Sequence, residues 1–354
     1  MFLALKEIKK EKLRSGLVIG MIILIGYLIF ILTSLALGLA RENTAAINSW
    51  NINKVALNDN ANVDMRQSLV TKKQARQLTE NEAYLGETSV VAKNAGNKKI
   101  SAVFVGLEDN QFIAQNLKIS QGHKVNGPNQ LVVDDSLKDK GFKLNSTLYL
   151  NGSKTPYKIV GFTKNAKLNI APVFYGQLDS WKTLRGVGTQ STAPVASAIV
   201  SKNAKYNNNQ TSVQTYTKQQ IINKLPGYTA QNNTFVMMIA FLMVISLVII
   251  AVFLYILTMQ KLPNYAVLRA QGIPGKVLVG ATISQSFLLV VSGVIAAGLL
   301  TALTAVIMPV TVPMSFDVPI LVFAGIGLLV MGLLGSLVSL KSVLNVDPVK
   351  VIGG

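Results

Sequence analysis

The chain has 354 residues, of which 50% are hydrophobic and only 14% are charged, and its mean hydropathy is +0.41. These values disfavour a soluble globular protein, and the lack of cysteine excludes disulfides and thiol chemistry. The net charge of +18 is spread along the chain without a nucleic-acid-binding motif, so membrane lipids and not nucleic acid are the predicted partners of these charges.

A basic segment and one apolar segment open the chain. Residues 1–15 predict a short amphipathic helix on the cytoplasmic membrane surface, or a plain basic flank, with apolar residues at helical spacing: Phe2, Leu5, Ile8 and Leu13. Leu17–Leu39 carries no charge and exceeds the roughly 20 residues needed to cross a hydrocarbon core. It is also longer than the roughly 7–15 apolar residues of a signal peptide, so a retained transmembrane helix is predicted within residues 1–40.

Residues 41–233 are mostly polar and predict a mixed α/β domain. Thr71 is a predicted N-cap for a helix through about Ala83, and Thr217 is a predicted N-cap for another. Asn151-Gly152 between two apolar runs predicts a hairpin. Further predicted elements are a helix at Gln177–Leu184 and strands at Ile100–Val105, Gln130–Val133, Thr147–Leu150, Tyr157–Phe162, Ala171–Tyr175 and Ala196–Val200.

Residues 234–354 hold three more uncharged spans, at Thr234–Thr258, Val277–Met308 and Pro319–Leu340. The predicted fold is therefore a membrane α-helical one. It has four transmembrane helices arranged one plus three, with a large mixed α/β extracellular domain between the first and the second. Among the short segments that flank the spans, Lys and Arg lie in the N-terminal flank, the loop 259–276 and the C-terminal tail, whereas the loop 309–318 holds only Asp317. The positive-inside rule then places both termini and that loop in the cytoplasm of a multi-pass protein of the cell membrane.

The cytoplasmic loop contains a predicted short helix at residues 262–272. Pro263 suits its first turn and Gly272 its end. Leu262, Tyr265 and Leu268 share one face, and Arg269 lies beside them, which predicts docking into a groove of a partner protein. An interfacial connector without a partner is the alternative.

No pattern in the chain predicts catalysis or a metal site. There is no Walker A motif, no His-Glu-x-x-His and no nucleophile elbow. His123 is the only histidine and lies in a polar stretch, and Asp134-Asp135 predicts a turn because adjacent strand residues point to opposite faces. A non-enzymatic subunit without an intrinsic cofactor is predicted. Since the spans also lack the ionisable residues of ion-coupled carriers, its energy is expected from another chain.

Several segments together resemble the MacB/FtsX-like permeases of ATP-binding cassette (ABC) systems. Residues 265–272 are similar to their coupling helix, residues 345–350 to their closing Asp-Pro motif, and residues 131–162 to the core of their extracellular domain. Within that family, residues 2–8 and 225–235 look most like HrtB-type haem-exporting permeases. The resemblance implies a homodimer, a cytoplasmic ABC ATPase subunit as partner, and haem as the transported substrate.

Haem iron commonly takes His, Cys, Met or Tyr as axial ligands, and cysteine is absent here. The candidate substrate-binding residues are therefore Met21, Tyr27, Tyr228, Met237 and Met238, with Glu42 as a helper. Packing methionines and interfacial tyrosines are the alternative interpretation of these positions. Alternative functions are an FtsX-like signalling element that controls a wall hydrolase, an exporter of antibiotics, lipids or lipoproteins, and an anchored surface-binding protein.

Overall fold

The computed structural model describes residues 10–94, 96–188, 190, 193–309 and 312–344. Its internal contacts divide the chain into two compact units. The helical unit comprises residues 1–38 and 232–354, and the α/β unit comprises residues 39–231. The predicted basic segment at residues 2–8 and the predicted closing motif at residues 345–350 lie outside the described residues.

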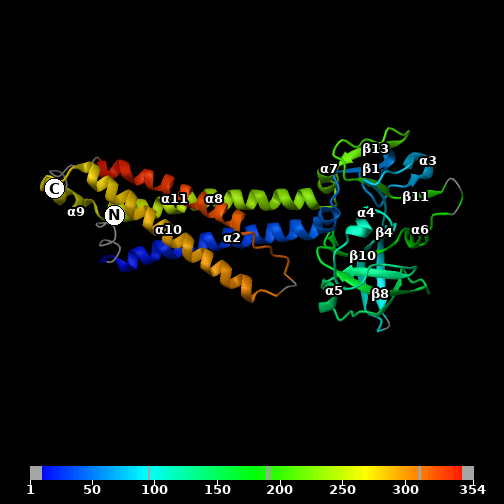
Figure 1. Ribbon diagram of the computed structural model, residues 1–354. Helices are drawn as coiled ribbons and strands as arrows, with labels where there is room; N and C mark the ends of the chain where they lie inside the picture. The colour runs from blue at the N-terminus through cyan, green and yellow to red at the C-terminus, as the bar shows by residue number, and fades with distance from the viewer. Residues whose placement is uncertain (1–9, 95, 189, 191–192, 310–311, 345–354) are drawn as a thin grey trace. The chain divides into compact units, whose positions relative to one another are not determined.

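The described part of the helical unit contains four long helices and one short one (Figure 1). Within the described residues, four helices are long and apolar enough to cross a membrane. The first precedes the α/β unit in the chain and the other three follow it, so the predicted one-plus-three layout is confirmed. The helices are α2 (Lys12–Ser49), α8 (Tyr228–Met259), the short α9 (Leu262–Ala270), α10 (Gly275–Ile307) and α11 (Val318–Leu344).

Apolar side chains of different helices meet in small clusters inside the helical unit. Ile22 of α2, Leu254 of α8 and Leu289 of α10 belong to one of them. Gly332 of α11 allows a close approach, because a Cβ atom there would lie 2.7 Å from the side chain of Val290 on α10. Such small residues are typical of helix packing in membranes, where close backbone contact replaces the hydrophobic effect.

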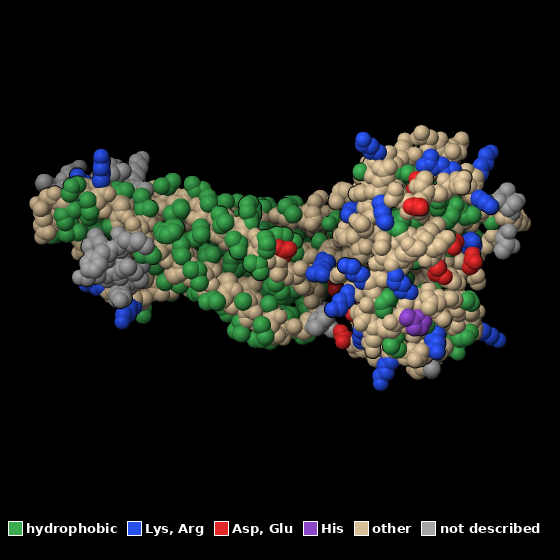
Figure 2. All heavy atoms as spheres, viewed as in Figure 1, with side chains coloured by type: hydrophobic (Ala, Val, Ile, Leu, Met, Phe, Trp, Pro, Cys, Tyr) green, Lys and Arg blue, Asp and Glu red, His purple; other side chains and the backbone are tan. Residues whose placement is uncertain are grey.

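Large apolar side chains also cover the outside of the helical unit, as Figure 2 shows for one face. On α8 the exposed set recurs about every four residues and includes Met237, Phe241, Ile245, Val248 and Val252. Exposed apolar area on this scale is unfavourable in water and suits the hydrocarbon of a bilayer.

The α/β unit is organised around one 11-stranded mixed sheet. The main strand order is β13-β1-β12-β3-β4-β10-β6-β8-β5, and β2 and β11 form a separate pair. The strands are β1 (Lys54–Asn58), β2 (Val70–Thr71), β3 (Glu82–Asn94), β4 (Lys99–Leu107), β5 (Ile119–Gly122), β6 (Gln130–Asp134), β7 (Thr147–Leu150), β8 (Pro156–Thr163), β9 (Lys167–Leu168), β10 (Ala171–Gln177), β11 (Pro194–Ala196), β12 (Ala198–Ser201) and β13 (Val213–Thr217).

Six of these strands close a ring. Strand β7 pairs with both β3 and β8, which completes the circuit β3-β4-β10-β6-β8-β7. Successive residues of a strand point to opposite faces, so the strands of the ring contribute to two cores. In β4, Phe104 belongs to the core inside the ring, whereas Val103 and Val105 belong to a second core on the other face. That second face is covered by the end of α2 and by α7 (Lys218–Asn223).

Local signals in the sequence located several elements correctly. The Asn151-Gly152 hairpin between β7 and β8 is confirmed, with φ of 50° and 74° at its two residues. The predicted strands lie within or across observed ones, and the predicted helix at Gln177–Leu184 corresponds to α6 (Leu178–Arg185). Thr217 caps α7 through a capping box with Gln220.

The helix predicted from Thr71 to about Ala83 is wrong in its length. Thr71 does cap a helix, but α3 spans only Lys72–Ala75 and ends at Arg76, whose φ is 51°. The chain then enters β3, whose residues Glu82–Leu85 pair with β12. A sheet partner more than 110 residues away in the sequence therefore overrides a local helical preference.

Candidate functional site

Helix α9 is the predicted coupling element, and its ends are set by the residues the sequence indicated. Pro263 lies in the first turn, where its missing N–H removes no helical hydrogen bond. Gly272 has a φ of 89°, which disfavours a side chain. Its turn lets the N–H of Ile273 donate to the carbonyl oxygen of Leu268 at 3.1 Å and satisfies the helix end.

One face of α9 is fixed to α10. The side chain of Tyr265 is 1% exposed and packs against Leu278. Its hydroxyl lies 3.3 Å from Thr282 Oγ1. Tyr265 thus anchors the short helix to a long one instead of facing outward.

A buried lysine provides a second link at the start of α9. Lys261 is 3% exposed, and its Nζ donates to Gln285 Oε1 of α10 at 2.7 Å. A buried ammonium is costly unless its donors are satisfied, so the amide oxygen stabilises this position. Motion of α9 is therefore tied to α10 through a polar contact and an aromatic one.

We expect Lys261→Met to lower the free energy of unfolding by about 1–3 kcal/mol, because the amide of Gln285 loses its charged donor in a buried site. Thermal unfolding of Lys261→Met, Gln285→Leu and the double variant in detergent measures the coupling between the two side chains. A coupling of about 1 kcal/mol or more is expected. Additive effects of the two single substitutions would contradict a direct link.

The outward face of α9 differs from the predicted one. The exposed residues recur at helical spacing and are Pro263, Asn264, Val267, Ala270 and Gln271. Of the predicted coupling residues, Leu262, Leu268 and Arg269 are half-buried, Tyr265 is buried and Gly272 forms the terminal turn. The sequence periodicity identified a helix with one apolar face, but it did not indicate that this face packs on α10.

Four of the six substrate-binding candidates lie in the helical unit. Met21 of α2 is half-buried, and the hydroxyl of Tyr27 lies 2.9 Å from Thr304 Oγ1 of α10. Met237 and Met238 of α8 are 57% and 37% exposed. Tyr27 already has a partner, whereas the two α8 methionines present their thioethers on an outer surface.

The other two candidates lie in the α/β unit. Glu42 forms an ion pair with Lys167 of β9. Tyr228 packs partly buried against the core that α7 covers. No group of three or more His, Asp or Glu side chains that could hold a metal ion occurs among the described residues.

The single histidine and the two adjacent aspartates make ordinary local contacts. His123 is exposed, and its Nδ1 lies 2.7 Å from the carbonyl oxygen of Lys124. Asp134 ends β6 and accepts hydrogen bonds from the N–H groups of Ser136 and Ala166, both at 3.0 Å. Asp135 pairs with Lys138 and lies between β6 and α5. The predicted turn is therefore confirmed for Asp135, whereas Asp134 is the last residue of the strand.

An apolar cavity of about 510 Å³ lies between α10 and α11. None of the six substrate candidates lines it, and Thr301 is its one hydroxyl-bearing side chain. Its other lining residues are Phe30, Val294, Gly298, Ala302, Ala305, Phe316, Val318, Leu321, Val322, Gly325, Ile326 and Leu329. The cavity suits an apolar group and offers no axial ligand for iron.

Two families of domains match the chain. Residues 15–221 match the MacB-like periplasmic core domain, and residues 236–348 match the FtsX-like permease C-terminal domain. The hemin transport system permease protein HrtB of Staphylococcus epidermidis is 26% identical over 356 residues, covering 100% of this chain and 99% of the relative. Its namesake in Staphylococcus haemolyticus is 26% identical over 360 residues with the same coverage.

Solved structures with similarity to the chain cover about half of it. The periplasmic region of MacB from Actinobacillus actinomycetemcomitans matches with 17% identity and a TM-score of 0.36, covering 51% of this chain and 96% of that one. The extracellular domain of the ABC-type transporter YknZ from Gram-positive bacteria matches with 12% identity and a TM-score of 0.34, covering 47% and 98%.

Proposed function

Because this chain belongs to the MacB/FtsX-like family of ABC transporter permeases, we propose that it exports haem or a similar amphiphile from the membrane, driven by a separate ATPase subunit. The permease is a multi-pass protein of the bacterial cell membrane. In this proposal it works without an active site of its own and as a homodimer.

The geometry of α9 carries the proposal. A short helix that begins at a Pro-containing first turn and ends at a glycine turn lies between two spans, is fixed to α10 through Tyr265 and Lys261, and keeps a separate face exposed. A simple connector needs neither of the two anchors. An ATPase that docks on the exposed face would move α9, and the anchors would pass that movement to α10.

Charge supports a cytoplasmic position for α9. Lys and Arg side chains gather at the end of the helical unit that carries α9, as Figure 2 shows. This distribution is typical of the cytoplasmic side. In the proposal both termini are cytoplasmic and the α/β unit is extracellular.

The cargo is proposed from two observations. The full-length relatives are named for hemin transport. The spans expose apolar side chains and hold an apolar cavity, which suits a lipid-soluble cargo better than an ion. Met237 and Met238 are the candidate ligands best exposed for contact with a cargo in the bilayer.

Growth under excess haem tests the function. Cells that lack the chain are expected to be inhibited at lower haem concentrations than cells that carry it, and the purified permease–ATPase complex is expected to shift the haem absorption spectrum. The double variant Met237→Leu and Met238→Leu keeps the apolar volume and should weaken the shift if these thioethers contact iron.

Equal haem tolerance in the two strains, together with an unshifted haem spectrum, would overturn the assignment of haem as the cargo. Altered cell separation or wall-hydrolase activity in the same cells would instead support the signalling alternative. Protection against a peptide antibiotic would support a different amphiphile.

A further inference from the structure

A cavity of about 240 Å³ lies in the α/β unit, on the sheet face opposite the ring interior. Its floor is made by alternate residues of β3 and β4, since Ser89 pairs with Val103 and Val91 pairs with Ser101. Its walls come from residues 63–66, residues 168–171 and the segment 221–226 at the end of α7. Its volume is below the roughly 300–1,000 Å³ of pockets for drug-sized ligands, so a small molecule or one side chain fits.

One buried carboxyl group lines this cavity without a partner. Glu87 of β3 is 4% exposed, and no described residue donates a hydrogen bond to its Oε2. Its main chain is well held, because Trp181 Nε1 donates to the Glu87 carbonyl oxygen at 3.1 Å. Most buried polar side-chain atoms have a partner, so an unpaired carboxyl oxygen at a cavity points to a ligand.

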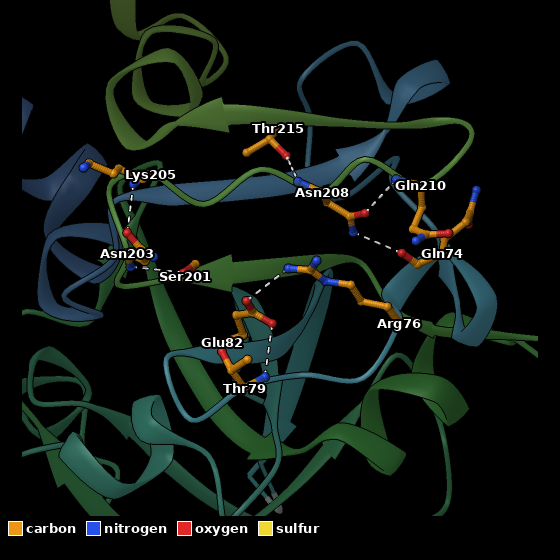
Figure 3. Close-up of polar contacts among 10 residues, drawn as sticks. All are labelled: Gln74, Arg76, Thr79, Glu82, Ser201, Asn203, Lys205, Asn208, Gln210 and Thr215. Carbon is orange, nitrogen blue, oxygen red and sulfur yellow. Dashed lines mark hydrogen bonds and ion pairs between the residues drawn. The ribbon is translucent and has the colours of Figure 1, made fainter.

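Another carboxylate on the same strand shows the usual arrangement. Glu82 of β3 is 6% exposed, and Figure 3 shows it between two donors. Arg76 Nη2 lies 3.4 Å from Oε1, and the N–H of Thr79 donates to Oε2 at 3.1 Å. Both oxygens of Glu82 therefore have partners, whereas Oε2 of Glu87 has none in the part of the chain that the structure describes.

The charges around Glu87 favour a cation. Asp64 already holds the guanidinium of Arg66, with Nε at 3.1 Å from Oδ1 and Nη2 at 2.8 Å from Oδ2. Lys224 lies at the cavity edge and is exposed. When Glu87 is ionised, it and Asp64 carry two negative charges against the guanidinium of Arg66 and the ammonium of Lys224. Because Arg66 is held by Asp64 and the exposed Lys224 is screened by solvent, the buried carboxylate of Glu87 has no close cationic partner among the described residues. Burial is the main reason that the pKa of Glu87 rises to about 8, with repulsion by Asp64 adding to the rise and Arg66 opposing it.

We propose that this cavity binds a small organic cation, a primary ammonium on a short aliphatic chain, whose charge pairs with Glu87. The ammonium has three N–H donors, and the hydroxyls of Ser89 and Ser101 supply further acceptors. Val63, Met65 and Leu168 line the cavity for the aliphatic part. This proposal does not depend on haem being the transported substrate.

The backbone beside the cavity is unusual. Val63 has a φ of 62°, and Ile170 has a φ of 69° between the lining residues Asn169 and Ala171. Left-handed backbone is rare for β-branched residues and persists where the surrounding fold imposes it. Two of the three walls of the cavity, residues 63–66 and 168–171, thus contain a backbone conformation that the surrounding fold imposes.

Saturation-transfer NMR on the full-length chain in deuterated detergent tests the site, with n-butylammonium as the probe. We expect it to bind, neutral n-butanol to bind at least tenfold more weakly, and Glu87→Gln to lower n-butylammonium affinity at least tenfold. Glu82→Gln is the matched control and should leave that affinity unchanged. Affinity should also rise about tenfold from pH 6 to pH 7 in the natural chain, since the carboxyl of Glu87 must lose its proton, and stay flat in Glu87→Gln.

Three results would overturn the proposal. They are no binding of n-butylammonium, equal affinity in Glu87→Gln, and tighter binding of n-butyrate than of n-butylammonium. The last would mean that Arg66 and Lys224 recruit an anion to a protonated Glu87. Haem tolerance is not expected to change with Glu87, so failure of this site and failure of the haem assignment are distinguishable.

Discussion

Val267→Asp is expected to abolish assembly with the ATPase subunit and the ATP hydrolysis that substrate stimulates. Val267 is 46% exposed at the centre of the outward face of α9. A carboxylate placed in the middle of an apolar contact must be desolvated on docking, and a central substitution of this kind costs about 2–4 kcal/mol, or roughly 30- to 1,000-fold in affinity. Co-purification of the two subunits and ATPase assays measure both effects.

Val306→Asp is the control for the added charge. Val306 is 84% exposed near the far end of α10, about 45 Å along the helix from its start beside α9. Assembly should survive this substitution. Unchanged assembly in Val267→Asp would remove this face of α9 from the docking surface, and equal loss in both variants would indicate general damage to the helices.

Glu87→Gln is expected to remove most of the pH dependence of stability between pH 4.5 and pH 8. The pKa of Glu87 is 4.5 in an ordinary setting and about 8 in the folded chain. Between these values the folded state binds a proton that the unfolded state has lost, so the free energy of unfolding falls as the pH rises. Each pKa unit corresponds to about 1.36 kcal/mol, so the full loss is on the order of 5 kcal/mol and is complete above pH 8.

Unfolding of the full-length chain in detergent, followed by tryptophan fluorescence, measures this effect. Trp181 reports on the site because its Nε1 donates to the Glu87 carbonyl oxygen. Glu82→Gln removes an acceptor of Arg76 and should keep the falling profile of the natural chain. A natural chain with equal stability at pH 5 and pH 8 would contradict a buried, protonated Glu87.

The sequence located features whose causes are local. Uncharged spans longer than 20 residues, the Asn151-Gly152 turn and the threonine caps at Thr71 and Thr217 each depend on residues close in the chain. The predicted helix ran into β3 because the pairing of residues Glu82 and Ala83 with β12 outweighs their local helical preference.

The candidate sites were less predictable for the same reason. Gln285 is a polar residue within an apolar span, and this signal could have indicated a buried contact, but its partner Lys261 was identifiable only from the fold. Glu87 lies in a strand, where a buried acidic side chain is unusual. Whether its carboxyl group has a hydrogen-bond partner depends on residues that the fold brings around it.

By itself, the sequence located four segments long and apolar enough to span a membrane, a mixed α/β domain after the first of them, and a short helix between the second and third. The length of an apolar segment, the residues of a turn and the cap of a helix depend on residues close together in the chain, so the sequence alone can predict them. Only the tertiary structure decided which face of α9 is exposed, and that Glu82 has hydrogen-bond partners while Oε2 of Glu87 has none among the described residues. Those facts depend on contacts between residues far apart in the chain, which periodicity does not encode.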